Sequence, residues 1–356
     1  MAPDLNDAED VAIPRDFRAI LIAAAVLACP AASFSAAKGT VPRQHRRRDG
    51  AAPKPPAAFD ARAANDAAVE QPLSRGDSGP AVLRAQVLLD RAHFSPGEID
   101  ASMGDNTVRA AAAFDAAHGI DASVPVSPAT WKALDRDARP VVVPYMIAPE
   151  DEAGPFLPNP EDMMEKATLP SMPYSSLLEE LAERFHASPA LLRRMNPGAD
   201  FAAAGKAIAA LDVDRPPLPK AASIRVSRSD LSVAVLDDAG KAIARYPATV
   251  GSEHDPLPLG EWKINGVGRD PVFHYNPDLF WDADSKDSKT TIPPGPNNPV
   301  GVVWIDLSKP HYGIHGTAEP AAIGKSQSHG CIRLTNWDAS DLAGLVAPGT
   351  PASLVP

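Results

Sequence analysis

The spacing of apolar residues changes from a helical period to a strand period near position 220. Upstream of it, Val82, Ala85 and Leu89 recur at intervals of three and four, which is typical of the buried face of a helix. Downstream of it, Val233 and Val235 alternate with small or polar residues, which is typical of a half-buried strand. The pattern therefore predicts a multidomain α+β chain, with helical units first and a mainly β domain after them.

Residues 70–136 are expected to form a small three-helix domain. The first helix carries the apolar face described above, and Ala110 and Phe114 mark the face of a second helix. Ser127 followed by Pro128 is typical of an N-cap with proline at the first helical position. A unit of about 65 residues has only a modest core.

A second helical unit is expected over residues 173–213. Ser176 and Glu179 form a capping-box pattern before a run of leucines. Ser188 precedes a proline that opens another short helix. The apolar run Ala207–Leu211 is expected to close the unit as a strand.

The first 36 residues are expected to be an export signal. An apolar run over residues 19–28 follows Arg15 and Arg18 and precedes a group of small residues, which is the order found in secretory signal peptides. The run is shorter than the ~20 residues that span a bilayer, and a buried alanine-rich helix is the alternative. The protein is therefore expected in the periplasm or cell wall. A lipoprotein-like cleavage box leaves open a lipid anchor at Cys29.

Two further segments are expected to be linkers. Residues 37–69 combine a basic run with prolines, alanines and aspartates, a composition typical of disorder. Residues 137–172 are rich in proline and acidic residues and are expected to form an ordered linker. A stiff proline-rich boundary, Arg215–Pro219, separates the upstream units from the β domain.

The composition of the whole chain narrows the function classes. With 356 residues, of which 44% are hydrophobic, the chain can bury several cores, so wholesale disorder is excluded. Its net charge of −11 disfavours a nucleic-acid partner, because such binding depends on lysine and arginine at the phosphates. The two cysteines, Cys29 and Cys331, exclude a disulfide framework and a cysteine-rich zinc site.

The residues with candidate chemistry gather between positions 311 and 336. Cys331 follows His329 and Gly330, and His315 lies upstream. An imidazole that takes the thiol proton makes cysteine a nucleophile for acyl transfer. The glycine leaves room for a substrate carbonyl, and the backbone N–H groups around it are suited to an oxyanion hole. Arg333 offers a bidentate donor for a substrate carboxylate.

Two other interpretations of these residues stay open. The first is a zinc site made by His311, His315, His329 and Cys331. These side chains carry zinc-binding atoms, but the chain has no His-Glu-x-x-His motif and no matching carboxylate. The second is an inert, buried cysteine beside histidines that only support the fold.

Several motifs of the C-terminal domain, expected over residues 223–356, occur in one order. They are Thr291–Gly301, Tyr312–Thr317, Ile323–Gly324 and Ser328–Leu334, with thirteen residues between His315 and the His-Gly-Cys of the last motif. Together they resemble the catalytic domain of the L,D-transpeptidases, the YkuD family. Pro258–Trp262 also resembles the family's Thr-Pro-x-Gly-x-Trp pattern, with Leu257 in place of the threonine. The resemblance implies a β-sandwich-like catalytic fold.

The resemblance also implies a role for each site residue. Cys331 is the nucleophile, His315 is its general base and acid, and the carbonyl of Gly316 orients the imidazole. His329 and Gly330 line the site. The implied substrate-binding residues are Arg333, Ser328, Tyr312 and Asn298. No metal and no cofactor is implied.

By the same resemblance, the enzyme acts on the peptide stems and glycan of peptidoglycan. The cysteine attacks the bond after the third residue of a tetrapeptide stem and releases D-alanine. Three acceptors stay open. An amine of a second stem gives a 3-3 cross-link, a lysine of an outer-membrane lipoprotein gives an anchored protein, and water makes the enzyme a carboxypeptidase. A non-catalytic wall-binding protein and a cysteine endopeptidase on ordinary proteins are the alternatives from other classes.

Two resemblances concern the upstream units. The first helical unit carries the series Leu73–Val82, Gln86, Ile99–Asp100, Gly104, Thr107, Ala113–Phe114, His118–Gly119 and Thr130–Leu134. This series resembles the peptidoglycan-binding-1 domain, with Asp115 where that pattern has glutamine and Ala101 where it has glycine. The unit over residues 173–213 resembles a LysM module, a small βααβ glycan-binding unit. Both imply tethering to the wall, which would raise the local substrate concentration.

Overall fold

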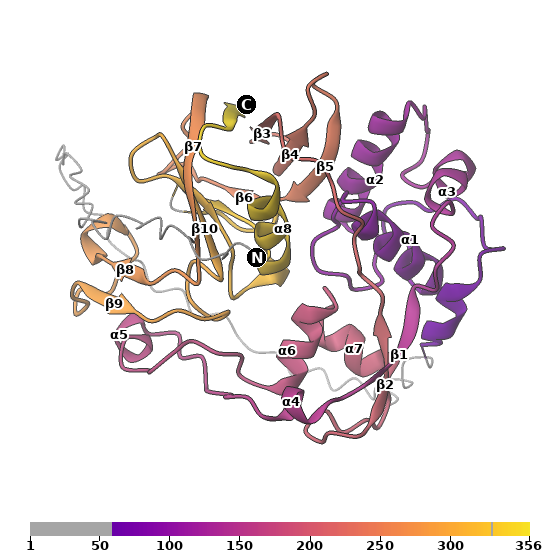
Figure 1. Ribbon diagram of the computed structural model, residues 1–356, viewed down its shortest axis with the longest axis horizontal. Coiled ribbons are helices and arrows are strands. Elements are labelled where there is room, and N and C mark those ends of the chain that lie inside the picture. Colours follow the sequence, from indigo (N-terminus) through magenta and orange to yellow (C-terminus); the bar gives the residue numbers. More distant parts are fainter. Residues whose placement is uncertain (1–58, 329) are drawn as a thin grey trace, which may run out of the picture. The chain divides into compact units, whose positions relative to one another are not determined.

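The computed structural model describes residues 59–328 and 330–356 (Figure 1). The expected signal peptide, the cleavage box at Cys29 and most of the expected linker over 37–69 lie outside these residues, and so does His329. Among the helices that are described, none is both long enough and apolar enough to cross a membrane.

The first upstream unit is built from a short 3-10 helix and three α-helices. They are η1 (Ala61–Asn65), α1 (Pro80–Arg91), α2 (Asp105–His118) and α3 (Pro128–Leu134). Local sequence explains where they begin and end: a proline begins α1 and α3, and Gly119 ends α2 in the left-handed conformation. Ala101, where the resembled pattern has glycine, also has a positive φ of 62°, which glycine adopts at lower cost.

The position of η1 corrects the expectation that residues 37–69 are disordered throughout. Ala61 and Ala64 are buried in the core of the helical unit. The side chain of Asn65 accepts the backbone N–H groups of Val141 and Val142 at 2.8 and 2.9 Å. Two alanines spaced three apart form a small apolar face, which the polar composition around them obscures in the sequence.

The expected linker over 137–172 contains a strand. Its Val142 pairs with Leu211 in an antiparallel two-stranded sheet, so the second unit begins near residue 142. Pro144 hides this strand in the sequence, because proline inside a strand argues against a central position in a sheet and is tolerated at an edge. The elements of the unit are β1 (Val142–Met146), α4 (Pro149–Glu152), α5 (Met163–Lys166), α6 (Leu177–Arg184), α7 (Pro189–Met195) and β2 (Ala207–Leu211).

The C-terminal domain is mainly β, as predicted. Its nine-stranded sheet has the order β5-β4-β3-β13-β7-β10-β11-β12-β6, and β8 pairs with β9 separately. The strands are β3 (Ser223–Ser227), β4 (Ser232–Leu236), β5 (Ala242–Pro247), β6 (Thr249–Val250), β7 (Gly260–Arg269), β8 (Phe273–Tyr275), β9 (Thr290–Ile292), β10 (Val303–Leu307), β11 (Gly313–His315), β12 (Ile332–Arg333) and β13 (Pro351–Val355). The helices are η2 (Pro277–Leu279), η3 (Pro320–Ala322) and α8 (Asn336–Leu345).

Strand β7 joins the two halves of the nine-stranded sheet. Its first residues pair with β13 and the rest pair with β10, which runs beside it (Figure 1). Because β7 is 10 residues long, both halves share it and are joined in one hydrogen-bonded strand order. One hydrophobic core spans both halves and α8, and it includes Tyr246, Ile305 and Leu342.

The upstream units pack directly on the C-terminal domain. The backbone N–H of Arg245 in β5 donates to the carbonyl of His93 at 2.8 Å, and the carbonyl of Arg245 accepts from Ser95 at 2.9 Å. The Asn106 side chain donates to the carbonyl of Ile323 at 2.8 Å. These units are therefore in contact with the catalytic sheet, whereas proline-rich linkers had been expected to hold them apart.

A buried ionic cluster lies at this junction. The Arg215 guanidinium is 2.6 Å from Asp90 of α1 and 2.8 Å from both Asp338 and Asp341 of α8. The side chains of Asp90 and Asp338 are fully buried, and that of Arg215 is 7% exposed. A single guanidinium therefore neutralises carboxylates from two units.

Replacing Arg215 with alanine is expected to lower the free energy of unfolding by about 3–5 kcal/mol, because two buried carboxylates would lose their counter-charge. Chemical denaturation measures this loss. Arg139→Ala is the matched control: its side chain is 45% exposed beside Asp137, so we expect a loss below about 1 kcal/mol. Equal losses in the two variants would contradict the role assigned to Arg215.

Candidate active site

Two neighbouring strands place Cys331 and His315 in the same part of the sheet. β11 and β12 pair in parallel, with Ile314 opposite Ile332, so the same register brings Cys331 beside Gly313. The backbone N–H of Gly313 donates to the cysteine sulfur. Position 313 must be glycine here, since a Cβ would lie 2.5 Å from the ring of Trp304.

The imidazole of His315 is fixed in one tautomer. Its Nδ1 is 2.7 Å from the carbonyl oxygen of Gly316, and because a carbonyl can only accept, Nδ1 carries the proton. Nε2 therefore keeps its lone pair and can accept another proton. The ring stacks on Trp304, with 5.4 Å between ring centroids and 14° between planes, which limits its rotation.

The electrostatic surroundings keep both groups of the pair neutral. Burial, and then the charge of Arg333, lower the pKa of His315 to about 3. Burial also raises the pKa of the Cys331 thiol, although the Gly313 N–H and the Arg333 charge act in the opposite direction. Near neutral pH the site therefore holds a thiol and a neutral imidazole.

Tyr312 and Arg333 flank the half-buried sulfur. A Cβ at Gly330 would lie 3.1 Å from the Tyr312 ring, and Gly330 has a φ of +92°, so both space and backbone favour glycine there. Burial, and then the neighbouring Cys331, raise the pKa of Tyr312. Arg333 follows the cysteine in β12 and is partly exposed, which leaves it accessible to a substrate carboxylate.

Ser328 and Asn298, two of the implied substrate-binding residues, are buried and bonded to the protein itself. The Ser328 hydroxyl donates to the carbonyl of Cys331 at 2.6 Å. The Asn298 amide donates to the carbonyl of Pro293 at 2.8 Å and accepts from the N–H of Val300 at 2.9 Å. Both side chains are at most 2% exposed. Both side chains therefore support the loops around the site.

His329 lies outside the described residues, so its role stays a prediction. Among the residues that are described, no group of three or more His, Cys, Asp and Glu side chains is arranged to hold a metal ion.

Sequence reasoning missed three residues of the site. Trp304 stacks on the imidazole, and Asn336 at the start of α8 accepts the N–H of Thr317 at 3.1 Å. The charge of Asp255 raises the pKa values of Cys331 and Tyr312, after the larger effect of burial. Asp255 and Trp304 were missed because they lie outside residues 311–336, where the candidate chemistry gathers. Asn336 was missed because its contacts are made only in the folded chain. The sequence signal that could have pointed to Trp304 and Asn336 is the set of glycines that pack against them, Gly313 on Trp304 and Gly301 and Gly316 on Asn336.

Comparison with known proteins identifies relatives of this chain. The family model of the L,D-transpeptidase catalytic domain, YkuD, matches residues 221–354. A Bacillus licheniformis protein named "Putative L,D-transpeptidase YkuD" is 32% identical over 182 residues, which are 50% of this chain and 93% of that protein. The Bacillus subtilis protein of the same name is 30% identical over 179 residues, which are 50% of this chain and 92% of that protein.

Solved structures show only a distant likeness. An L,D-transpeptidase from Mycobacterium smegmatis matches 37% of this chain and 57% of its own, with 19% identity and a TM-score of 0.30. One from Xylanimonas cellulosilytica matches 80% of this chain and 97% of its own, with 16% identity and a TM-score of 0.34. The chain thus spans little more than half of the mycobacterial structure, and family membership depends on the sequence relatives.

Proposed function

The chain belongs to the YkuD family and is an L,D-transpeptidase, and we propose that its reaction passes through a thioester on Cys331. The thioester carries the acyl group of a peptidoglycan tetrapeptide stem. One observation carries this proposal: Cys331 directly precedes β12, which pairs in parallel with β11, and β11 ends at His315, whose Nδ1 donates to the Gly316 carbonyl. Nε2 is thereby left to accept the thiol proton.

The proposed reaction has two steps. In the first, the Cys331 sulfur attacks the carbonyl carbon of the third stem residue, in its peptide bond to D-alanine, while the thiol proton moves to Nε2 of His315. Collapse of the tetrahedral intermediate breaks the C–N bond, and the same proton passes to the leaving nitrogen of D-alanine. In the second, the acceptor amine attacks the thioester, His315 takes its proton, and the proton returns to the sulfur as the thiolate leaves.

The remaining site residues have supporting roles in this proposal. Backbone N–H groups around Gly330 and Cys331 are suited to the developing oxyanion. The Arg333 guanidinium is suited to a carboxylate of the stem. Because burial keeps the thiol and the imidazole uncharged near neutral pH, the proposal requires the thiol proton to pass to the imidazole when the sulfur attacks.

Incubation with purified disaccharide-tetrapeptide, followed by mass spectrometry of the products, tests the proposed function. A dimer with released D-alanine identifies a stem amine as acceptor, and tripeptide with D-alanine identifies water. A lipoprotein carrying an exposed lysine, added to the same reaction, tests the third acceptor. No product from the stem, together with cleavage of casein, would replace the proposal with an ordinary cysteine endopeptidase.

We further propose that the upstream units bind the wall and that the protein is exported to reach it. Two observations support this: the resemblance of residues 70–136 to a peptidoglycan-binding unit, and the antiparallel pairing of β1 with β2 around a segment that includes α6 and α7. A hollow of about 340 Å³ on α2 and the segment after it includes Val108, Ala116 and Ile120 in its lining. This hollow is the candidate binding surface of the first unit.

Filling that hollow by Ala116→Arg is expected to weaken sedimentation with purified sacculi and to leave turnover of the soluble stem unchanged. Ala116 is exposed, so the larger side chain needs no space in the core. The matched control is Ala67→Arg, which adds the same charge at another exposed alanine of the unit. If both variants sediment like the wild type, the unit acts only as a structural support.

A further inference from the structure

We propose that Glu183, on α6 of the second upstream unit, is a positioning residue for the catalytic imidazole and acts through Asn336. The inference rests on the proposed function, since it assumes that His315 carries the proton. It makes the upstream unit part of the catalytic machinery, in addition to any role in binding the wall.

The first link is the side-chain amide of Asn336. This residue is 2% exposed and lies at the start of α8. Its Oδ1 accepts the backbone N–H groups of Thr317 and Val302 at 3.1 and 3.2 Å. Its Nδ2 donates to the carbonyl of Pro296 at 3.1 Å and to Oε1 of Glu183 at 2.9 Å. The oxygen and both N–H groups of the amide are therefore hydrogen-bonded.

The second link joins that amide to the peptide that holds His315. A Cβ at Gly316 would lie 2.2 Å from Asn336 Oδ1, and a Cβ at Gly301 would lie 2.0 Å from the same oxygen. Asn336 therefore packs directly against the Gly316 peptide, whose carbonyl accepts the His315 Nδ1 proton at 2.7 Å. A displaced amide would move the acceptor that fixes the imidazole.

The third link is the carboxylate. Oε1 of Glu183 accepts the Asn336 amide and also the Tyr174 hydroxyl, at 2.9 and 3.2 Å. An acceptor at this place and the carbonyl of Pro296 take the two N–H groups of the amide. Glu183 thereby contributes to holding Nδ2 toward α6 and Oδ1 on the side of Thr317.

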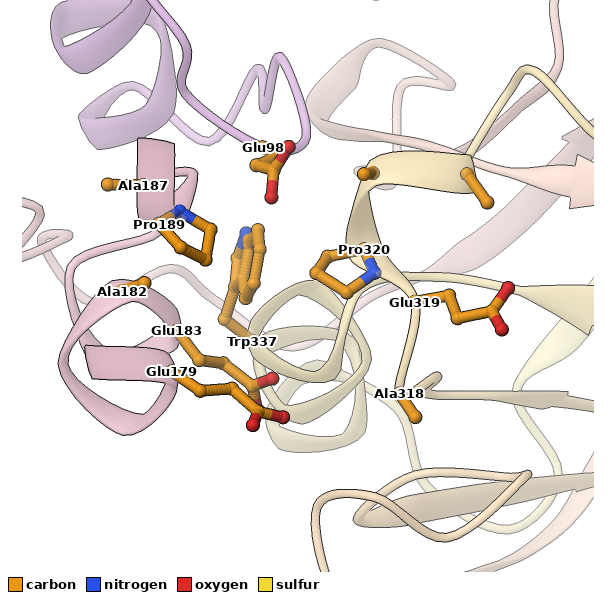
Figure 2. A pocket seen from close by; sticks show the side chains of 12 residues that line it. Glu98, Glu179, Ala182, Glu183, Ala187, Pro189, Ala318, Glu319, Pro320 and Trp337 are labelled. Carbon is orange, nitrogen blue, oxygen red and sulfur yellow. The ribbon is translucent and has the colours of Figure 1, made fainter. Parts of the chain in front are cut away.

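A cavity beside Glu183 decides how the link can be tested. It has a volume of about 460 Å³, and Glu98, Glu179 and Trp337 are also among its lining residues. Figure 2 shows Glu183 and Glu179 extending from α6 toward the helix that carries Trp337. Because the cavity gives room at this end of the side chain, a substitution of similar length is expected to be tolerated by the fold.

The test compares Glu183→Met with Glu183→Gln in the full chain. Glutamine keeps an oxygen that can accept the Asn336 amide, whereas methionine has similar length and no such acceptor. We expect Glu183→Met to lower kcat by about 3- to 30-fold, the range for residues that act through a packed network. We expect KM and the thermal midpoint to change little, and Glu183→Gln to restore kcat. Glu98→Ala, a glutamate of the same cavity without a contact to Asn336, is the control and should match the wild type.

A second readout separates this inference from the proposed function. The rate of Cys331 alkylation by iodoacetamide, followed by peptide mass mapping, needs no substrate and should fall in Glu183→Met but not in Glu183→Gln. Equal alkylation rates in all variants would overturn the positioning role. An inactive wild type on the stem peptide would instead count against the proposed function. If Glu183→Met does not fold, Glu183→Ala is measured in its place.

Discussion

Turnover of the tetrapeptide stem is expected to disappear in Cys331→Ala, while the catalytic domain stays folded. The thioester cannot form without the sulfur, so the first step has no nucleophile. The half-buried side chain lies at the end of a strand pair that is held by backbone hydrogen bonds, and its loss removes little packing. Product analysis by mass spectrometry and the thermal midpoint measure the two effects.

Cys331→Ser tests whether the sulfur itself is required. We expect it to be inactive as well, because serine is a far weaker nucleophile without a base arranged for it. Turnover by Cys331→Ala within about tenfold of the wild type would exclude covalent catalysis by this residue, since even a general acid–base contribution is larger.

His315→Ala is expected to slow thioester formation by roughly 10²–10⁴-fold, the usual contribution of a general acid–base catalyst. The thiol is mostly protonated near neutral pH because burial raises its pKa, so a variant without the His315 imidazole lacks the group proposed to take the proton. Single-turnover release of D-alanine measures this step.

The pH dependence of the wild type follows from the same two groups. With a pKa of about 3, His315 is already deprotonated at pH 5, so its protonation should not depress the rate between pH 5 and 7. The rate of Cys331 alkylation should instead rise with pH, up to the raised pKa of the thiol. His329→Ala is the control. If that variant shifts the alkylation profile and His315→Ala does not, the roles of the two histidines are reversed.

The types of many elements could be predicted from the sequence because their signals are local. Ser127, Ser176 and Ser188 each cap the helix that follows them, and the alternation around Val233 marks a strand. The spacing between His315 and Cys331 could be interpreted because it belongs to a family motif.

The junction between the units could not be predicted, because it depends on pairs far apart in the chain. Arg215 lies in a proline-rich boundary, yet its buried partners Asp90 and Asp338 stand more than a hundred residues away on either side. The contact between Glu183 and Asn336 spans 153 positions. No local periodicity carries such information, so the upstream units were expected to stand apart from the site they contact.

The strand β1 was missed for a different reason. Pro144 breaks the sequence pattern of a strand, but the two-stranded sheet with β2 leaves an open edge that accommodates it. The sharing of β7 between both halves of the large sheet also has no sequence signal. Its pairing with β13 over its first residues and with β10 over the rest is set only in the folded chain.

The most direct test of the account is intact-mass spectrometry of the enzyme after acid quenching of a reaction with the tetrapeptide donor and no added amine. We predict an adduct with the mass of the donor less D-alanine, mapped to the peptide containing Cys331, absent in Cys331→Ala and lost when an acceptor amine is added. An adduct on another residue, or release of D-alanine by Cys331→Ala at the wild-type rate, would contradict the account.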